Sequence, residues 1–373
     1  MKILCVIDSL GSGGAQRQLV NLAIGFKEKG HEVSFLVYHN LNFFQKQLDE
    51  AQIKIHYIVE PNYLKRLLKF RKFLRRGNQD AVLSFLEASN FMCEIAGLPF
   101  RKWKLVVGER SANPNILKSF KLRAYRWFHL FADYVVANSN ENISMVKKLN
   151  PLIPNRKFKV IYNKVDLNKW KPKSNKVSAS DETFKILVIA NHQPLKNALG
   201  LIKAVQLLPD FLKKKLSVHW YGRQDSHEVE EAFSQAIDLV KEYKLDTTIQ
   251  FFPPTSEIHN LIHNYNALGL FSFYEGFPNT ICEGMAAGKS IVASSVSDVP
   301  IFIEEGINGY LCDPNEAQSI ANALIKAVES PKELLGEMGK RNREKAEDMF
   351  STEKTVDMYL ELFHELSNNN KTG

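Results

Sequence analysis

The fold is decided at the start of the chain, in residues 2–30, KILCVIDSLGSGGAQRQLVNLAIGFKEKG. A compact apolar run, residues 2–7, is followed by a glycine-rich turn at residues 11–14. A helical pattern of apolar residues then continues through Phe26 and stops at Gly30. A strand, a glycine loop and a helix in this order are typical of the first unit of an α/β domain with a parallel sheet.

Cycles of strand and helix continue along the whole chain of 373 residues. Further strands are expected at residues 31–38, 81–85, 105–107, 134–137, 184–189, 216–221, 249–252, 268–273, 290–293 and 310–312. The polar stretch KPKSNKVSASDE, residues 171–182, lacks such a pattern and is expected to be a linker.

The sequence therefore predicts an α/β protein of two doubly wound, Rossmann-like domains, residues 1–170 and 183–345. C-terminal helices at residues 346–373 are expected to pack back toward the first domain. Open α/β sheets bind ligands beyond the carboxyl ends of their strands, so we expect the site in a cleft between two facing sheets.

The composition excludes several classes of protein. With 45% hydrophobic and 24% charged residues, the chain can bury large cores, which excludes a disordered or low-complexity protein. The four cysteines stand far apart, so neither a disulfide framework nor a cysteine-rich zinc site is expected, and a reducing cytoplasm is the expected compartment. No apolar run approaches the ~20 residues of a membrane-spanning helix, and the N-terminus is typical of a buried strand, not of a signal peptide.

The net charge of +8 is distributed unevenly. Residues 1–170 contain 28 basic and 13 acidic residues, a net charge of +15, whereas residues 171–373 contain 21 basic and 28 acidic residues, a net charge of −7. This asymmetry predicts that the first half meets an anionic surface or polymer and that the second half has a different role.

The most specific motif is YEGFPNTICEGMAAGK, residues 274–289, which follows a predicted strand. Glu275 lies on the loop, and Glu283 lies in the early turns of a helix expected to begin near Asn279 and to end at Gly288. Unpaired N–H groups from Gly276 through Thr280 would bind anionic or hydroxyl oxygens at the start of this helix. Two carboxylates that accept hydrogen bonds suit vicinal hydroxyls of a sugar, although either acid alone could be an ordinary surface residue.

A second cluster is IANHQPLKN, residues 189–197, which follows the first strand of the second half. Asn197 is a plausible N-cap of a helix at residues 198–208. The ammonium of Lys196 and the free N–H groups of that helix start would converge at one point, where a diphosphate fits.

With these motifs, the sequence resembles the retaining glycosyltransferases of family 4, which have the GT-B architecture of two facing Rossmann-like domains. The resemblance covers essentially the whole chain. Its specific part is the run from Glu275 to Gly288, and weaker matches are SGGAQR (12–17), VGERSANP (107–114), VANS (136–139), IYNKVD (161–166) and EEGINGYLCDP (304–314).

The resemblance implies a role for each matching residue of the donor site. Glu283 would hold the ribose of the nucleotide, and Glu275 would face the hydroxyls of the donor sugar. Lys196 would stabilise the departing diphosphate. The backbone of Gly276, Phe277, Pro278 and Asn279 would lie along the sugar, and Thr280 would also bind the donor. The first glycine loop, with Gly13 and Gly14, would lie near donor and acceptor.

The sequence departs from the family pattern at two places. Asn191 stands where the family usually has an Arg, and Arg223 after the next strand is a candidate replacement for that cation. Glu109, Arg110 and Ser111 stand on the acceptor side, where many members have a His or Asp. We assign no catalytic base, because a retaining transfer in which the leaving phosphate oxygen takes the acceptor's proton does not require one.

Two other kinds of site are disfavoured by the sequence. Residues 11–14 lack the full G-x-G-x-x-G spacing, and no acid that would hold an NAD ribose ends the second strand, so a dehydrogenase is not expected. His192 and His219 have no partner at metal-ligand spacing and are expected to be satisfied or solvated. We expect neither a metal nor a cofactor.

Two basic, aromatic runs occur in the first half, YLKRLLKFRKFLRR (63–76) and KSFKLRAYRWFHLF (118–131). Basic amphipathic helices suit an anionic membrane surface, where each Lys or Arg contributes about 1 kcal/mol. The membrane-facing candidates are Lys65, Arg66, Lys69, Lys72, Arg75 and Arg76. Alternatively, these cations form a solvated face of the helix. Nucleic acid is not an expected partner, because no recognised nucleic-acid-binding motif accompanies the charge.

The expected function is a metal-independent, retaining transfer of a hexose or N-acetylhexosamine. The donor would be a nucleotide sugar, UDP-linked, and the acceptor a growing, lipid-linked glycan of a bacterial surface polysaccharide or glycoprotein. The enzyme would be cytoplasmic and peripheral on the inner face of the cytoplasmic membrane. A sugar-nucleotide epimerase or hydrolase of the same fold, and a non-catalytic nucleotide-sugar-binding protein, are the alternatives.

Overall fold

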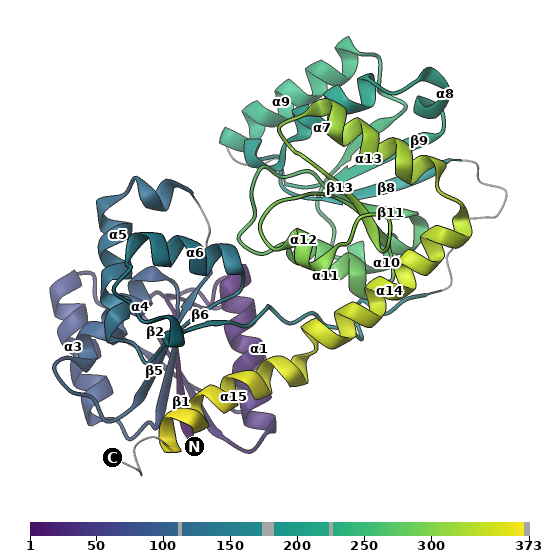
Figure 1. The fold of residues 1–373 in the computed structure, drawn as a ribbon. Helices are drawn as coiled ribbons and strands as arrows, with labels where there is room; N and C mark the ends of the chain where they lie inside the picture. Colours follow the sequence, from purple (N-terminus) through teal and green to yellow (C-terminus); the bar gives the residue numbers. More distant parts are fainter. Residues whose placement is uncertain (111–113, 174–182, 224–226, 369–373) are drawn as a thin grey trace. The chain divides into compact units, whose positions relative to one another are not determined.

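The structure, a computed structural model, describes residues 1–110, 114–173, 183–223 and 227–368. The chain divides into two compact units (Figure 1). The first unit comprises residues 1–164 together with residues 352–373, and the second comprises residues 165–351. The C-terminal segment therefore returns to the unit that contains the N-terminus.

The first unit is built on a seven-stranded parallel sheet in the order β3-β2-β1-β4-β5-β6-β7. Its strands are β1 (Lys2–Val6), β2 (Glu32–Val37), β3 (Lys54–Tyr57), β4 (Ala81–Phe85), β5 (Lys104–Glu109), β6 (Tyr134–Ala137) and β7 (Phe158–Val160). Its helices are α1 (Gly14–Glu28), α2 (Gln45–Glu50), α3 (Tyr63–Arg76), α4 (Glu87–Gly97), α5 (Phe120–Trp127), α6 (Asn140–Leu149) and α15 (Thr352–Asn368), with the 3₁₀ turns η1 (Pro114–Leu117), η2 (Phe128–Phe131) and η3 (Asn155–Lys157).

Two apolar cores cover the two faces of this sheet. Side chains of α1 and α15 pack on one face, where the ring of Phe26 lies edge-on to those of Tyr359 and Phe363. Side chains of α3, α4 and α6 pack on the other face, where Phe70 and Leu74 are buried. This arrangement of helices on both faces is the doubly wound form that the sequence predicts.

The second unit is built on a six-stranded parallel sheet in the order β10-β9-β8-β11-β12-β13. Its strands are β8 (Phe184–Ile189), β9 (Leu216–Tyr221), β10 (Ile249–Phe252), β11 (Ala267–Leu270), β12 (Ser290–Ser294) and β13 (Gly309–Cys312). Its helices are α7 (Ala198–Gln206), α8 (Asp210–Lys213), α9 (His227–Glu242), α10 (Ile258–Leu261), α11 (Asn279–Ala286), α12 (Val299–Phe302), α13 (Ala317–Glu329) and α14 (Lys332–Phe350), with η4 (Pro194–Lys196) and η5 (Ile262–Asn264).

All the strands expected from the sequence are present, and two strands were missed. The missed strands are β3, which is half-exposed, and β7, which has only three residues. The strand expected at residues 268–273 ends at Leu270, so Ser272 and Phe273 belong to the following loop. All four cysteines are buried free thiols.

Helix α14 is held against α11 by a close approach of two backbones. A side chain at Gly339 would place its Cβ 2.1 Å from the carbonyl oxygen of Gly288, which follows α11 and has a φ of +69°. The buried amide of Asn342 adds hydrogen bonds to the carbonyl oxygens of Lys289 (2.8 Å) and Asn308 (2.7 Å). The position of α11 therefore depends on the absence of a side chain at Gly339.

We predict that Gly339→Ala and Gly336→Ala have opposite effects on the free energy of unfolding. Gly336 lies on the same helix with open space around it, so alanine there should stabilise the protein by about 0.5–1 kcal/mol through helix propensity. Alanine at Gly339 should destabilise it by about 2 kcal/mol or more, because α14 must move away from Gly288. Urea unfolding of both variants measures this difference, and equal effects would contradict the proposed contact.

Candidate active site

Lys196 and Glu275 meet at the carboxyl edge of the second sheet. Strands β8 and β11 are paired and parallel, so the loops that follow them begin at the same edge. The Nζ atom of Lys196 lies 2.6 Å from Oε1 of Glu275, and the backbone N–H of Phe273 donates to the carbonyl oxygen of Leu195 at 2.9 Å. Two residues chosen from separate motifs thus form one largely buried ion pair.

Ser272 is a member of this cluster that the sequence did not reveal. Its hydroxyl donates to Oε1 of Glu275 at 2.7 Å, so that oxygen accepts from both Ser272 and Lys196. Only its position three residues before Glu275 in the loop after a strand could have pointed to it. The two hydrogen bonds fix the orientation of the carboxylate.

Helix α11 begins at Asn279, as predicted, and carries Glu283 just past its middle. No side-chain cap is found at its N-terminus within the described residues, which suits an oxygen-rich ligand there. The predicted run of unpaired N–H groups needs one correction. Pro278 has no N–H, and the N–H of Asn279 donates to the carbonyl oxygen of Phe277 at 2.9 Å.

The side chain of Phe277 points into the core of the second unit. Its ring centroid lies 5.9 Å from that of Phe302 and 6.2 Å from that of Phe350, both in edge-on arrangements. The side chain is buried, so it anchors the loop between Glu275 and α11. A ligand on this loop would meet its backbone, as the resemblance implies.

Asn197 caps α7, as predicted. Its Oδ1 accepts from the N–H of Gly200 at 3.1 Å, and its Nδ2 donates to the carbonyl oxygen of Pro314 at 2.8 Å. Its φ is +60°, in the left-handed region that Asn tolerates better than most residues. This turn places Lys196 directly before the helix start.

Arg223 and Asn191 lie side by side at the ends of β9 and β8. The backbone N–H of Arg223 donates to Oδ1 of Asn191 at 3.4 Å. The approach requires a glycine before Arg223, because a Cβ at Gly222 would lie 1.9 Å from the carbonyl oxygen of Ala190. The backbone of Arg223 therefore lies beside Asn191, the position at which the family pattern has a cation.

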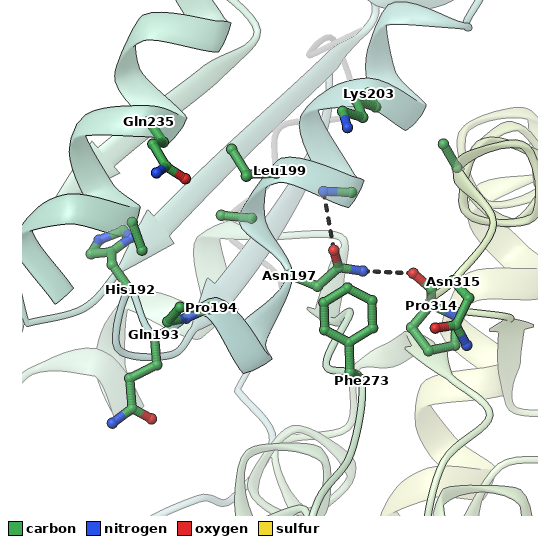
Figure 2. Close-up of a pocket in the computed structure, with 14 residues that line it drawn as sticks. His192, Gln193, Pro194, Asn197, Leu199, Lys203, Gln235, Phe273, Pro314 and Asn315 are labelled. Carbon is green, nitrogen blue, oxygen red and sulfur yellow. Dashed lines mark hydrogen bonds between the residues drawn. The ribbon is translucent and has the colours of Figure 1, made fainter. Parts of the chain in front are cut away.

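A cavity of about 350 Å³ opens around the first turn of α7 (Figure 2). It is lined by His192, Gln193, Asn197, Leu199, Gln235 and Phe273, among others. Lys196, Glu275 and the predicted donor-binding residues are not among its lining residues, within the part of the chain that the structure describes. The cavity thus borders the loop that holds Lys196 without containing the ion pair.

Neither histidine named from the sequence has the surroundings of a metal ligand. The ring of His219 hydrogen-bonds to Tyr265 (2.8 Å) and Ser217 (3.0 Å). His192 is buried and stacks on Trp220, and burial lowers its pKa to about 4, so it is neutral at physiological pH. Among the described residues no group of three His, Cys, Asp or Glu side chains could hold a metal ion.

Two of the three residues predicted for the acceptor side have partners within the first unit. Glu109 is buried and pairs with Arg126 and His129. Arg110 donates to Asn163 at 3.0 Å and to the hydroxyl of Tyr359, and its guanidinium lies over the ring of Phe85. Ser111 lies outside the described residues. Gly13 and Gly14 are exposed where α1 begins.

Two family models together match nearly the whole chain. The model described as glycosyl transferases group 1 matches residues 171–345, and the model described as Glycosyltransferase Family 4 matches residues 12–169. The first match covers the segment with Lys196, Glu275 and Glu283.

Similar proteins of known name are glycosyltransferases or related enzymes. The N-acetyl-alpha-D-glucosaminyl L-malate synthase of Bacillus anthracis is 22% identical over 93% of this chain and 92% of its own length. A Campylobacter jejuni alpha-1,4-N-acetyl-D-galactosaminyltransferase, whose name gives a glycan on PP-undecaprenol as its acceptor, is 24% identical over 99% of both chains. The crystal structure of Anabaena HepE in complex with UDP matches with a TM-score of 0.84, at 20% identity, over 98% of this chain and 100% of that chain.

The two family matches, the two parallel sheets and the residues gathered at the edge of the second sheet agree with one another. The chain belongs to the family 4, group 1 glycosyltransferases with the GT-B fold, and it is a glycosyltransferase.

Proposed function

We propose that this enzyme is a retaining, metal-independent transferase of a hexose or N-acetylhexosamine from a UDP-sugar to a lipid-linked glycan. The observation that carries the proposal is the 2.6 Å pair of Lys196 and Glu275 beside the uncapped start of α11. Lys196 supplies a cation for a diphosphate, and Glu275 supplies an acceptor for sugar hydroxyls. Both act where loops of two neighbouring strands begin.

In the proposed reaction the bond between the anomeric carbon and the diphosphate oxygen breaks. The acceptor oxygen bonds to the same face of that carbon, and its proton passes to the departing phosphate oxygen. Lys196 stabilises the charge that develops on the diphosphate, with Arg223 as the second cation. Glu275 holds the sugar ring, and Glu283 holds the ribose.

The names of similar proteins support the choice of donor and acceptor. HepE is described in complex with UDP and with UDP-glucose. An Escherichia coli relative, 24% identical over 66% of this chain, is named a UDP-Gal:alpha-D-GlcNAc-diphosphoundecaprenol alpha-1,3-galactosyltransferase. The C. jejuni relative likewise has an undecaprenol-linked acceptor in its name. These relatives favour a UDP-sugar and an acceptor on a polyprenyl diphosphate.

The surface of α3 supports peripheral contact with a membrane. Leu64 and Leu68 are 69% and 66% exposed, whereas Phe70 and Leu74 of the same helix are buried. Two exposed leucines on a helix with seven cations form an amphipathic surface of the kind that binds at a lipid interface. We therefore propose that the outer face of α3 rests on anionic lipid.

The six cations proposed for this surface have different surroundings. Lys69 pairs with Glu60, Arg66 lies over the ring of Tyr38, and Arg75 donates to the carbonyl oxygens of Leu98 (2.6 Å) and Phe100 (2.9 Å). Lys65, Lys72 and Arg76 are exposed. The side chain of Phe100 is 83% exposed, so Arg75 connects α3 to a loop that carries a further exposed apolar side chain.

In the described part of the chain, no helix is long and apolar enough to cross a bilayer. We propose a location on the inner face of the cytoplasmic membrane, where a cytosolic donor and a lipid-linked acceptor meet. Binding would combine the charge of α3 with its exposed leucines.

A panel of UDP-sugars, incubated with the enzyme and extracted lipid-linked glycans, tests the proposed function. Transfer to the lipid fraction would support it, whereas rearranged or hydrolysed sugar would favour an epimerase or hydrolase. Binding without turnover would favour a non-catalytic protein. Repeating the panel with EDTA tests the metal-free mechanism, and the anomeric proton of the product, read by NMR, tests retention.

We predict that Glu275→Ala and Lys196→Ala each reduce kcat by about 100-fold or more at saturating donor, because each removes charge or orientation at the reacting bond. Glu283→Ala should mainly weaken UDP binding, measured by calorimetry. Lys214→Ala and Glu329→Ala, at exposed positions of the same unit, are matched controls and should leave both values unchanged. A near-normal kcat for Glu275→Ala would contradict the site.

We predict that Lys65→Gln and Lys72→Gln together weaken sedimentation with anionic vesicles, and that adding Leu64→Ser and Leu68→Ser abolishes it. Lys27→Gln and Lys148→Gln remove equal charge from other exposed positions of the first unit and should bind vesicles normally. Binding should also fall with added salt, because the ~8 Å screening length at physiological ionic strength shortens further. Unchanged sedimentation of the fourfold variant would show that α3 is a solvated face.

A further inference from the structure

A network of four charged side chains lies inside the first unit, apart from the donor site. Its members are Glu94 on α4, Glu109 at the end of β5, Arg126 on α5 and His129 on η2. All four are buried, and their side chains are 3% exposed or less. Of these four residues, only Glu109 was predicted from the sequence to belong to a site.

The network is connected by short contacts. The ring of His129 bridges two carboxylates, with Nδ1 2.6 Å from Glu94 and Nε2 2.8 Å from Glu109. Arg126 donates from Nη2 to the second oxygen of Glu109 at 2.8 Å and to Glu87 at 3.2 Å. Both oxygens of Glu109 are therefore engaged by cationic groups on the α5–η2 segment, residues 120–131.

The charges in this network are coupled: His129 and Glu109 stabilise each other's charged forms, whereas burial raises the pKa of Glu94. Burial lowers the pKa of His129, but the carboxylates of Glu94 and Glu109 outweigh that effect and raise it to about 9. Burial also opposes ionisation of Glu109, and Arg126 with His129 more than compensate, so the pKa of Glu109 is lowered. His129 is thus a cation at physiological pH, and both of its ring nitrogens donate.

Burying such a network costs solvation energy that apolar side chains would not cost. The surrounding core consists mainly of apolar side chains, with a few buried amides such as Asn150, which donates to the carbonyl oxygen of Arg126 at 3.2 Å. What the network does provide is a single, defined position of the α5–η2 segment against the end of β5. The carboxyl end of a strand is where open α/β sheets place ligands.

The outer side of the same segment is apolar and exposed. Phe120 is 85% exposed, and Trp127 and Phe131 are also exposed. Arg101 donates to the carbonyl oxygen of Phe131 at 2.7 Å, next to the exposed Phe100, so the segment adjoins the loop that Arg75 of α3 holds. The outer side of the α5–η2 segment therefore has an apolar surface suited to lipid, and its inner side carries the cations that bind Glu109.

We propose that His129 and Glu94 are positioning residues for the acceptor. Through Glu109 and Arg126 they hold the end of β5 in a fixed position against the α5–η2 segment. The part of the chain that meets the acceptor's sugar and the part that meets its lipid carrier then stay in one arrangement. This inference rests on the proposed function, because it assigns the acceptor to the edge of the first unit.

The test measures KM for the acceptor, KM for the donor and the melting temperature of three variants. Glu94→Gln keeps a hydrogen-bond acceptor for His129 and removes a charge, and His129→Gln removes the bridge. Val82→Ala, in the buried core of β4 and away from the charges, is the matched control for lost stability. We expect Glu94→Gln and His129→Gln to raise acceptor KM by about tenfold, with donor KM nearly unchanged. Val82→Ala should lower only the melting temperature.

A pH profile separates positioning from stability. Acceptor KM of the wild type should rise as pH passes about 9, where His129 loses its proton, and in Glu94→Gln the rise should begin at lower pH because one carboxylate that stabilises the cation is gone. The groups that face His129 are Glu94, Glu109 and, through Glu109, Arg126. Should His129→Gln not fold, Glu94→Gln alone decides the question.

Unchanged acceptor KM in Glu94→Gln, together with an unshifted pH profile, would overturn the inference and leave a purely structural network. Equal effects on acceptor KM from Val82→Ala would overturn it as well. Efficient use of a lipid-free glycan by the wild type would instead overturn the lipid-linked part of the proposed function. The same comparison of acceptor KM, made with that glycan, would still decide the inference.

Discussion

The parallel pairing of β8 with β11 is the constraint on which the candidate site depends. It brings the loops after both strands to one edge, so that Lys196 and Glu275, 79 residues apart, form an ion pair. Helices α7 and α11 begin at this same edge, and each presents a helix start to it. The close approach of β9 at Gly222 adds Arg223 beside Asn191.

The rigidity of this edge comes from packing behind it. Phe277 anchors the loop through Phe302 and Phe350, and α14 holds α11 through the contact of Gly339 with Gly288. Tight packing of this kind transmits small displacements, because side chains in a dense core have no space to absorb them. The geometry of the candidate site therefore depends on residues that touch no ligand.

The basic side chains of the first unit have at least two kinds of surroundings. Lys65, Lys72 and Arg76 point into solvent, whereas Arg126 points inward to Glu109. Arg75 lies between these cases, since it is exposed and yet binds two backbone carbonyls. Each of them carries the same charge, so composition alone cannot distinguish an exposed cation from a buried one that pairs with a carboxylate.

The sequence alone predicted the order of most strands along the chain, the cap at Asn197 and the two motifs that carry Lys196 and Glu275. These are local properties, since they depend on apolar periodicity, on residues that favour turns and on helix starts. It missed β3 and β7, whose patterns are too short or too polar to stand out. The tertiary structure was needed to show that Lys196 reaches Glu275 and that Glu109 is enclosed by Arg126 and His129. Those partners come from other parts of the chain, and their meeting depends on which strands pair and which helices pack together, a long-range outcome that no local pattern encodes.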